Sequence, residues 1–277
     1  METASLILAA GRGSRMKGYS GNKTLLPLNP EASAYEGTSP ILLQILTNLP
    51  PGPKAIIVNH KKEDVIKTTQ DLDVTYREQP QLNGTGGALL AAIDFITAET
   101  CESIIITMGD VPFVTADSYT QMIKHLADHS LVVLGFIPES RKQYGVLEVT
   151  GNQVKKIIEW KYWKTYPDKR KQALRICNSG IYALKREVLV DYLPVLASRP
   201  HLVRKEVDGK LKDVKEFFIT DLIEYMHEDG LSIGYIIAED EEEVMGIDDL
   251  SALTRAQAIY RSGIKDKGQF LKVTDRT

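Results

Sequence analysis

A glycine-rich turn followed by two basic side chains is the strongest chemical signal in the sequence. Residues 8–16 read LAAGRGSRM, and Lys23 follows them. Because glycine carries no side chain, Gly11 and Gly13 allow backbone N–H groups to approach a phosphate closely. The dinucleotide pattern GxGxxG is broken by a methionine at its third glycine, and no Gly-Lys-Ser/Thr of a Walker loop follows. The turn therefore predicts a phosphate site that carries two cations, Arg15 and Lys23.

A carboxylate follows directly after another apolar run. Residues 104–108 read IIITM and predict a buried strand, after which Gly109 and Asp110 come next. Ligands of open α/β sheets collect at the carboxyl ends of strands. Mg²⁺ prefers hard oxygen ligands, usually one or two carboxylates together with substrate phosphates. An aspartate in this position is otherwise often a turn residue or a helix cap, but beside a phosphate turn Asp110 is interpreted as a metal ligand.

The opening motif resembles that of the sugar-1-phosphate nucleotidyltransferases. Their signature, L-A-A-G-x-G-[ST]-R-M followed by a lysine in a proline-containing turn, is matched by residues 8–16, Lys23 and Pro27. Within this family the chain is most similar to the uridyltransferase domain of the bacterial bifunctional N-acetylglucosamine-1-phosphate uridyltransferases. The resemblance implies catalytic roles for Arg15 and Lys23 at the β- and γ-phosphates of a nucleoside triphosphate. The nucleotide-binding residues that it implies are Ala10, Gly11, Gly13, Gln79, Gly84 and Thr85.

Further motifs follow in the order in which the family has them. Residues 144–145 (YG), 157–161 (IIEWK) and 177–182 (CNSGIY) resemble the family's sugar-binding segments and imply that Gly145, Glu159 and Asn178 bind the sugar. Residues 243–249 (EVMGIDD) resemble E-V-x-G-V-N-[ND], which implies that Asp248 joins Asp110 as a second metal ligand. Residues 218–222 (FITDL) match Y-I-T-D-I, although helix capping explains the threonine and the aspartate as well as substrate contact does.

Three departures from the family pattern affect the details. Asn22 stands where a proline usually precedes the lysine, and Gly87 stands where the similar uridyltransferases have histidine. Asp248 replaces an asparagine, which keeps a hard oxygen ligand and adds negative charge, so metal binding is expected to survive. The β-helix acetyltransferase domain of the bifunctional enzymes does not follow in this sequence, so no acetyl transfer is expected.

The resemblance implies a reaction. The expected activity is Mg²⁺-dependent transfer of a nucleoside monophosphate from a nucleoside triphosphate, UTP, to a sugar-1-phosphate, N-acetylglucosamine-1-phosphate, with release of pyrophosphate. A uridylyl- or thymidylyltransferase acting on glucose-1-phosphate and a transferase acting on another phosphorylated small molecule stay open. So does a catalytically silent protein that binds a nucleotide sugar.

The pattern of apolar segments predicts the elements that must position these residues. Buried strands are expected at residues 6–10, 55–58, 104–108 and 131–134, and helices at 40–49, 61–70, 87–96 and 116–128. A hairpin is expected at 146–158, and later strands at 179–184 and 233–238. Thr220 is expected to cap a helix that Gly230 ends, and Asp249 to cap a last helix that ends at Arg261. This order predicts a three-layer α/β/α fold with a mixed, mostly parallel, Rossmann-like sheet.

Domain organisation and partners follow from the sequence as a whole. We expect a single domain over residues 1–277, with a charged surface loop at 199–216 and a loosely held tail at 262–277. The 34 Lys and Arg residues against 37 Asp and Glu residues give a net charge of -3, which disfavours nucleic-acid binding. No run of about 18 apolar residues and no signal peptide is found, so a cytoplasmic protein without a membrane partner is expected. The oligomeric state stays open.

Overall fold

The computed structural model describes residues 2–207 and 210–274, with side chains for all of these except residues 205–207, 210, 212 and 264–274. Within this part of the chain one sheet is built from β1 (Thr3–Leu8), β4 (Lys54–Val58), β5 (Thr75–Glu78), β6 (Ser103–Met108), β7 (Leu131–Phe136), β8 (Val146–Thr150), β9 (Gln153–Ile158), β10 (Cys177–Lys185) and β13 (Ile233–Ile237). The strand order is β13-β7-β10-β6-β1-β4-β5, and β8 joins β9 to β10. Only β10 runs antiparallel among the seven strands of this path. The predicted mixed, mostly parallel sheet is confirmed.

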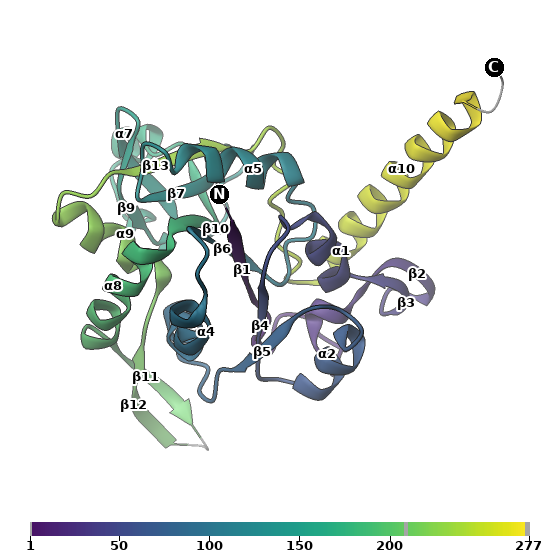
Figure 1. The fold of residues 1–277 in the computed structure, drawn as a ribbon, viewed down its shortest axis with the longest axis horizontal. Helices are drawn as coiled ribbons and strands as arrows, with labels where there is room; N and C mark the ends of the chain where they lie inside the picture. The colour runs from purple at the N-terminus through teal and green to yellow at the C-terminus, as the bar shows by residue number, and fades with distance from the viewer. Residues whose placement is uncertain (1, 208–209, 275–277) are drawn as a thin grey trace.

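Helices cover both faces of the sheet (Figure 1). Strand side chains alternate between the faces, so Ile7 belongs to one buried cluster and Leu6 to the other. The first cluster receives side chains from α1 (Ile41–Asn48), α2 (Lys62–Thr69), α5 (Ala116–His125) and α10 (Leu250–Thr274). The second receives them from α3 (Thr85–Ala91), α4 (Ile93–Ala98), α8 (Arg186–Ser198) and α9 (Ile219–Glu228). The predicted three layers are therefore present.

The carboxyl ends of three adjacent parallel strands carry the segments of chemical interest. The phosphate turn follows β1 and leads to a short 3₁₀ helix, η1 (Lys23–Leu25), while the Gly109–Asp110 pair follows β6. The loop between β4 and α2 lies on the other side of β1. Two short helices, α6 (Trp160–Trp163) and α7 (Asp168–Ala173), follow β9.

The last helix extends beyond its predicted end. It begins beside Asp249, whose carboxylate accepts the Ala252 N–H at 2.9 Å as predicted, but it runs past Arg261 to Thr274. The apolar spacing that set the predicted end lapses after Arg261, whereas no proline interrupts the backbone hydrogen bonds of the helix there. Gln257 anchors the helix by donating to carbonyls of the hairpin β2 (Pro27–Ser33) and β3 (Glu36–Pro40) and of its turn. Loose attachment of residues 262–277 stays a prediction, and residues 275–277 lie outside the described chain.

The predicted surface loop at residues 199–216 is wrong. These residues form a hairpin of β11 (His201–Val207) and β12 (Lys210–Glu216), which projects from the body of the protein (Figure 1). Arg204 pairs across it with Asp213 at 3.3 Å. Leu202 and Leu211 lie on the same face of the hairpin and are 73% and 72% exposed, so this face is open to solvent. On the opposite face Val203 and Val214 are only half-buried. With so few buried side chains the segment shows no clear alternation of apolar and polar residues, so the sequence did not reveal its strands.

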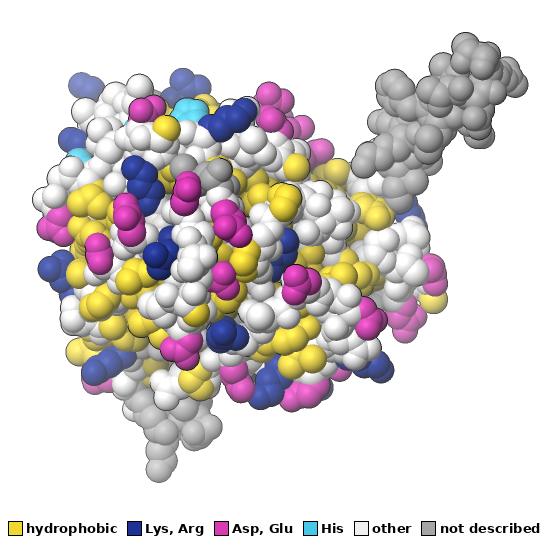
Figure 2. All heavy atoms as spheres, in the orientation of Figure 1, with side chains coloured by type: hydrophobic (Ala, Val, Ile, Leu, Met, Phe, Trp, Pro, Cys, Tyr) yellow, Lys and Arg dark blue, Asp and Glu magenta, His cyan; other side chains and the backbone are white. Residues whose placement is uncertain are grey.

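The surface carries mixed charge. On the face drawn in Figure 2, acidic and basic side chains of the described residues are interspersed rather than gathered by sign. Among the helices of residues 2–207 and 210–274, none has the length and apolar character needed to cross a bilayer.

Candidate active site

The phosphate turn opens into the site from the end of β1. Ala10 is buried, and a Cβ added at Gly11 would meet no atom within 4 Å, so this part of the turn faces open space. Gly13 has a positive φ of 62°, and a Cβ there would lie 3.1 Å from the Lys23 side chain. Glycine is therefore needed at position 13 for a second reason besides phosphate access, because it leaves room for the Lys23 side chain beside the turn.

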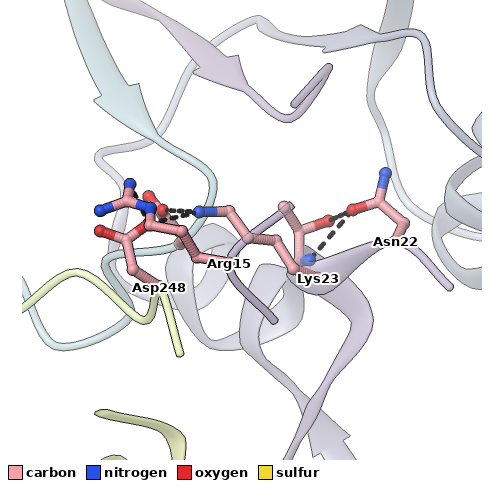
Figure 3. Close-up of polar contacts among 6 residues, drawn as sticks. Arg15, Asn22, Lys23 and Asp248 are labelled. Carbon is pink, nitrogen blue, oxygen red and sulfur yellow. Dashed lines mark hydrogen bonds and ion pairs between the residues drawn. The ribbon is translucent and has the colours of Figure 1, made fainter. Parts of the chain in front are cut away.

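The structure brings Arg15, Lys23, Asp110 and Asp248 together, although Lys23 and Asp248 are 225 positions apart in the sequence (Figure 3). The Lys23 ammonium contacts both carboxylates and lies 2.9 Å from Asp248 Oδ1. Arg15 reaches the same oxygen at 2.8 Å. The Lys23 side chain is 14% exposed, whereas that of Arg15 is 71% exposed. One cation of the pair is therefore enclosed and the other is open to solvent.

The charge of Lys23 is stabilised by its partners. Burial by itself lowers the pKa of Lys23, but the charges and hydrogen bonds of Asp110 and Asp248 together outweigh burial and raise that pKa above its usual value. The two acidic segments are also tied by backbone, because the Ile247 N–H donates to the Asp110 carbonyl at 2.9 Å. Ion pairs between side chains and a hydrogen bond between main chains therefore both hold this cluster together.

The two carboxylates also fit a divalent cation. Because both reach the single ammonium of Lys23, their oxygens converge on one point, which suits a hard cation. Among the residues that the structure describes, no group of three or more His, Cys, Asp or Glu side chains is arranged to hold a metal. A cation here would therefore take its remaining ligands from substrate phosphates and water.

A pocket of about 280 Å³ adjoins this cluster and unites most of the predicted nucleotide residues. Its lining includes Ala10, Gly11, Gln79, Gly84 and Thr85, together with Lys23 and Asp110. Gly13 does not line it. The pocket lies beyond the carboxyl ends of β1, β5 and β6, beside the start of α3.

The loop after β5 is held by internal hydrogen bonds that the sequence did not predict. The Gln79 amide donates to Asn83 Oδ1 and to the Gly84 carbonyl, both at 3.0 Å. Gly84 has a φ of 93°, and a Cβ there would lie 2.3 Å from the Phe217 carbonyl. A Cβ at Gly87 would lie 1.8 Å from Asn83 Oδ1, so glycine in place of histidine makes room for Asn83. Asn83 was not identified from the sequence, and its contact with Gln79 appears only in the fold.

Helix α9 is capped differently from the prediction. Thr220 is not its N-cap, because Phe218 holds that position and makes no side-chain cap. The Thr85 hydroxyl instead accepts the Ile219 N–H at 3.2 Å, from 134 positions earlier in the chain. A cap supplied by a distant residue leaves no local sequence signal. Gly230 ends the helix as predicted, with a φ of 82° and its N–H on the His227 carbonyl.

The three predicted sugar-binding residues come from three segments that lie side by side: before β8, after β9 and within β10. The Asn178 N–H donates to the Gly145 carbonyl at 2.9 Å, and a Cβ at Gly145 would lie 3.6 Å from Glu159 Oε2. Burial raises the pKa of the Glu159 carboxyl, and Thr220 donates to its Oε1 at 3.5 Å. The Asn178 side chain already donates to the Tyr182 hydroxyl and accepts the Gly180 N–H, so both of its polar atoms have partners within β10.

A larger pocket, of about 730 Å³, extends outward from Glu159. Its lining includes Trp160, Tyr162, Phe218, Thr220 and Asp221, as well as His201 from the base of the projecting hairpin. His201 Nε2 lies 2.9 Å from Asp221 Oδ2. Sequence reasoning did not identify His201, because it lay in a segment taken for a loop. The pocket joins aromatic surfaces to hydrogen-bonding side chains, a combination that suits a polar small molecule with apolar faces.

Comparison with known proteins identifies the family. A family described as the MobA-like NTP transferase domain matches residues 5–199. The chain belongs to this family. Among curated proteins, the bifunctional protein GlmU of Campylobacter lari is 29% identical over 271 residues, which are 96% of this chain and 56% of that protein. GlmU of Jannaschia sp. is 31% identical over 94% of this chain and 52% of its own length. The predicted sugar-1-phosphate nucleotidyltransferase family is confirmed, and the chain spans about half the length of these relatives.

Solved structures support the nucleotidyltransferase fold. A Bacillus anthracis protein assigned as a glucose-1-phosphate thymidylyltransferase, in complex with sucrose, superposes with a TM-score of 0.65. It is 21% identical and the match covers 94% of this chain and 95% of that one. A Methanothermobacter nucleotidyl transferase gives a TM-score of 0.60 at 19% identity, over 95% of this chain and 99% of that one.

Proposed function

We propose that this nucleotidyltransferase transfers uridine monophosphate from UTP to N-acetylglucosamine-1-phosphate and releases pyrophosphate. The observation that carries the proposal is the convergence of Arg15 and Lys23 with Asp110 and Asp248 beside the 280 Å³ pocket. Two cations and two carboxylates that meet beyond the carboxyl ends of β1 and β6 are suited to bring anionic substrates together.

The proposed chemistry needs charge stabilisation more than proton transfer. An oxygen of the sugar phosphate attacks the α-phosphorus, a new P–O bond forms, and the bond to the leaving pyrophosphate breaks. The nucleophile is already an anion, so no general base is required. The barrier comes from bringing anions together and from the charge that grows on pyrophosphate. Arg15 and Lys23 neutralise the β- and γ-phosphates in this proposal, and the glycine turn donates backbone N–H groups.

Asp110 and Asp248 are the residues that would hold Mg²⁺. Bound to them, the ion would supply positive charge to phosphate oxygens. The Lys23 ammonium and a metal ion would draw on the same two carboxylates. If the Lys23 ammonium moved to a substrate phosphate, it would free both carboxylates for the metal. Phosphate binding by Lys23 and metal binding by Asp110 and Asp248 would then be coupled.

The base and the sugar are assigned from the pockets and the relatives together. Gln79 lies in the smaller pocket. Because its two amide N–H groups are bound to Asn83 and Gly84, its side-chain carbonyl would accept a hydrogen bond from the ring N–H of uracil or thymine. Gly145, Glu159 and Asn178 would surround the sugar. UTP and N-acetylglucosamine-1-phosphate are supported by the motifs that resemble those of the bifunctional N-acetylglucosamine-1-phosphate uridyltransferases; the two curated relatives carry the name bifunctional protein GlmU. The alternative is a thymidylyltransferase acting on glucose-1-phosphate, favoured by the name of the Bacillus anthracis structure.

A substrate matrix tests the proposal. Each of UTP, dTTP, CTP, ATP and GTP is incubated with N-acetylglucosamine-1-phosphate or glucose-1-phosphate, and pyrophosphate release and nucleotide-sugar formation are measured. The highest kcat/KM is expected with UTP and N-acetylglucosamine-1-phosphate, and an Asp110→Asn variant serves as the inactive control. Release of pyrophosphate only with dTTP and glucose-1-phosphate would select the alternative. Binding of nucleotide without pyrophosphate release from any pair would contradict an enzymatic role.

A further inference from the structure

Asn22, the residue that departs from the family's proline, is buried at the entry of η1. It is 1% exposed and forms the N-cap of this short helix, directly before Lys23. Its Oδ1 accepts the Thr24 N–H at 3.0 Å and the Thr24 hydroxyl at 2.8 Å. The side chain therefore fixes the backbone on both sides of Lys23 (Figure 3).

The other end of the same amide reaches two strand ends. Asn22 Nδ2 donates to the Ala9 carbonyl at 3.3 Å and to the His60 carbonyl at 2.8 Å. Ala9 directly follows β1, and His60 lies in the loop after β4, the parallel neighbour of β1. One side chain thus binds the phosphate turn, the next loop and the lysine-bearing helix to each other.

Thr24 extends this connection to a third strand end. A Cβ built on Gly109 would lie 3.0 Å from the Thr24 methyl group, so the methyl packs against the residue that precedes Asp110. The Gly109 N–H donates to the Leu8 carbonyl at 3.0 Å, which completes the contact between β1 and the segment after β6. Thr24 is itself buried, with 2% exposure.

We propose that Asn22 is a positioning residue that aims the Lys23 ammonium at Asp110 and Asp248. Its catalytic consequence rests on the proposed function, whereas its geometric consequence does not. An amide suits the position because it donates to two carbonyls and accepts two hydrogen bonds at the same time. A carboxylate could only accept and would face both carbonyls with negative charge. A proline would restrict the backbone of the turn without linking Lys23 to the ends of β1 and β4.

The test measures the state of the Lys23 amine directly. Wild type, Asn22→Ala and Asn22→Asp are treated with a limiting amount of an amine-acylating reagent. Modification of Lys23 is then quantified by mass spectrometry relative to Lys54, which lies at the opposite end of β4. The Lys23 side chain is only 14% exposed and its amine is held against Asp110 and Asp248, so loss of these contacts opens the amine to the reagent. We expect the Lys23 to Lys54 ratio to rise several-fold in both variants.

The kinetic arm uses the substrate pair found by the matrix. We expect kcat of Asn22→Ala to fall by about 10²-fold, the cost of a displacement of about 1 Å in a reacting geometry, with a smaller change in KM. Asn29→Ala is the matched control, because Asn29 also binds a threonine hydroxyl, at 3.0 Å, but in the hairpin of β2 and β3. This control should keep both kcat and the labelling ratio of wild type.

Several outcomes would overturn the proposal. It fails if folded Asn22→Ala keeps the wild-type labelling ratio and kcat, or if Asn29→Ala raises the ratio equally. Should Asn22→Ala not fold, Thr24→Val decides, because it removes only the hydroxyl bonded to Asn22 and keeps a buried apolar shape. An unchanged ratio in Thr24→Val would then refute the role, and a raised ratio would support it. If the wild-type protein shows no turnover, the proposed function fails while the labelling comparison still tests Asn22.

Discussion

Replacing Lys23 by methionine should tighten the binding of a divalent cation to the nucleotide-free protein while removing most of its turnover. The Lys23 ammonium contacts both Asp110 and Asp248, so it holds the point at which the two carboxylates would share a metal ion. Methionine is of similar length and carries no charge. The variant therefore leaves both carboxylates in place and removes the cation that competes for them.

The magnitude follows from the charges and their exposure. Two unit charges about 4 Å apart interact by about 4 kcal/mol at an effective dielectric constant of about 20. The side chains of Lys23, Asp110 and Asp248 are 14%, 18% and 34% exposed, so solvent screens part of this energy. A third of it, about 1.4 kcal/mol, corresponds to a Kd that is about tenfold lower. Loss of one preorganised cation should lower kcat by about 10²–10³.

The assay titrates Mn²⁺ into nucleotide-free protein and measures the free ion by electron paramagnetic resonance. Lys62→Met is the matched control, because Lys62 forms an exposed ion pair with Glu78 at 2.6 Å outside the site. This control should bind Mn²⁺ as wild type does. An unchanged or weaker affinity in Lys23→Met would refute the reasoning, because it would mean that Asp110 and Asp248 do not form the metal site.

Three further predictions concern single residues of the site. Arg15→Ala should lower kcat by about 10²–10³ by removing an electrostatic stabiliser, and full turnover would remove Arg15 from the mechanism. Asp110→Asn should lose Mg²⁺-dependent activity, so a Mg²⁺ titration like that of wild type would argue against ligation by Asp110. Burial raises the pKa of Glu159, so on acidification this carboxylate takes up its proton at a higher pH than an ordinary glutamate. The KM for the sugar phosphate should therefore rise as pH falls through that raised pKa. Glu159→Gln should show a KM that does not change with pH in the same range. If the KM of this variant still depended on pH, the effect would belong to another group.

The main elements could be predicted because their side chains have a buried face. Alternation or continuous burial in β1, β4, β6 and β7 leaves apolar runs in the sequence, and Gly230 and Asp249 mark helix ends through local backbone chemistry. The hairpin of β11 and β12 has one exposed face and only a few half-buried side chains on the other, so its strands were taken for a loop. The predicted cap of α9 was wrong for a related reason. The hydroxyl that accepts the Ile219 N–H belongs to Thr85, which lies 134 positions earlier in the chain.

The sequence by itself determined the family, the order of most strands of the central sheet, and the identity of the charged residues of the candidate site. These properties depend on residue types and on spacings of a few positions, which local chemistry constrains. Only the tertiary structure decided that Asp110 and Asp248 both contact Lys23. It also decided that Gly13 leaves room for the lysine side chain and that Asn22 joins the ends of β1 and β4. Such contacts depend on which strands become neighbours in the sheet, and neighbours in space leave no fixed spacing along the chain.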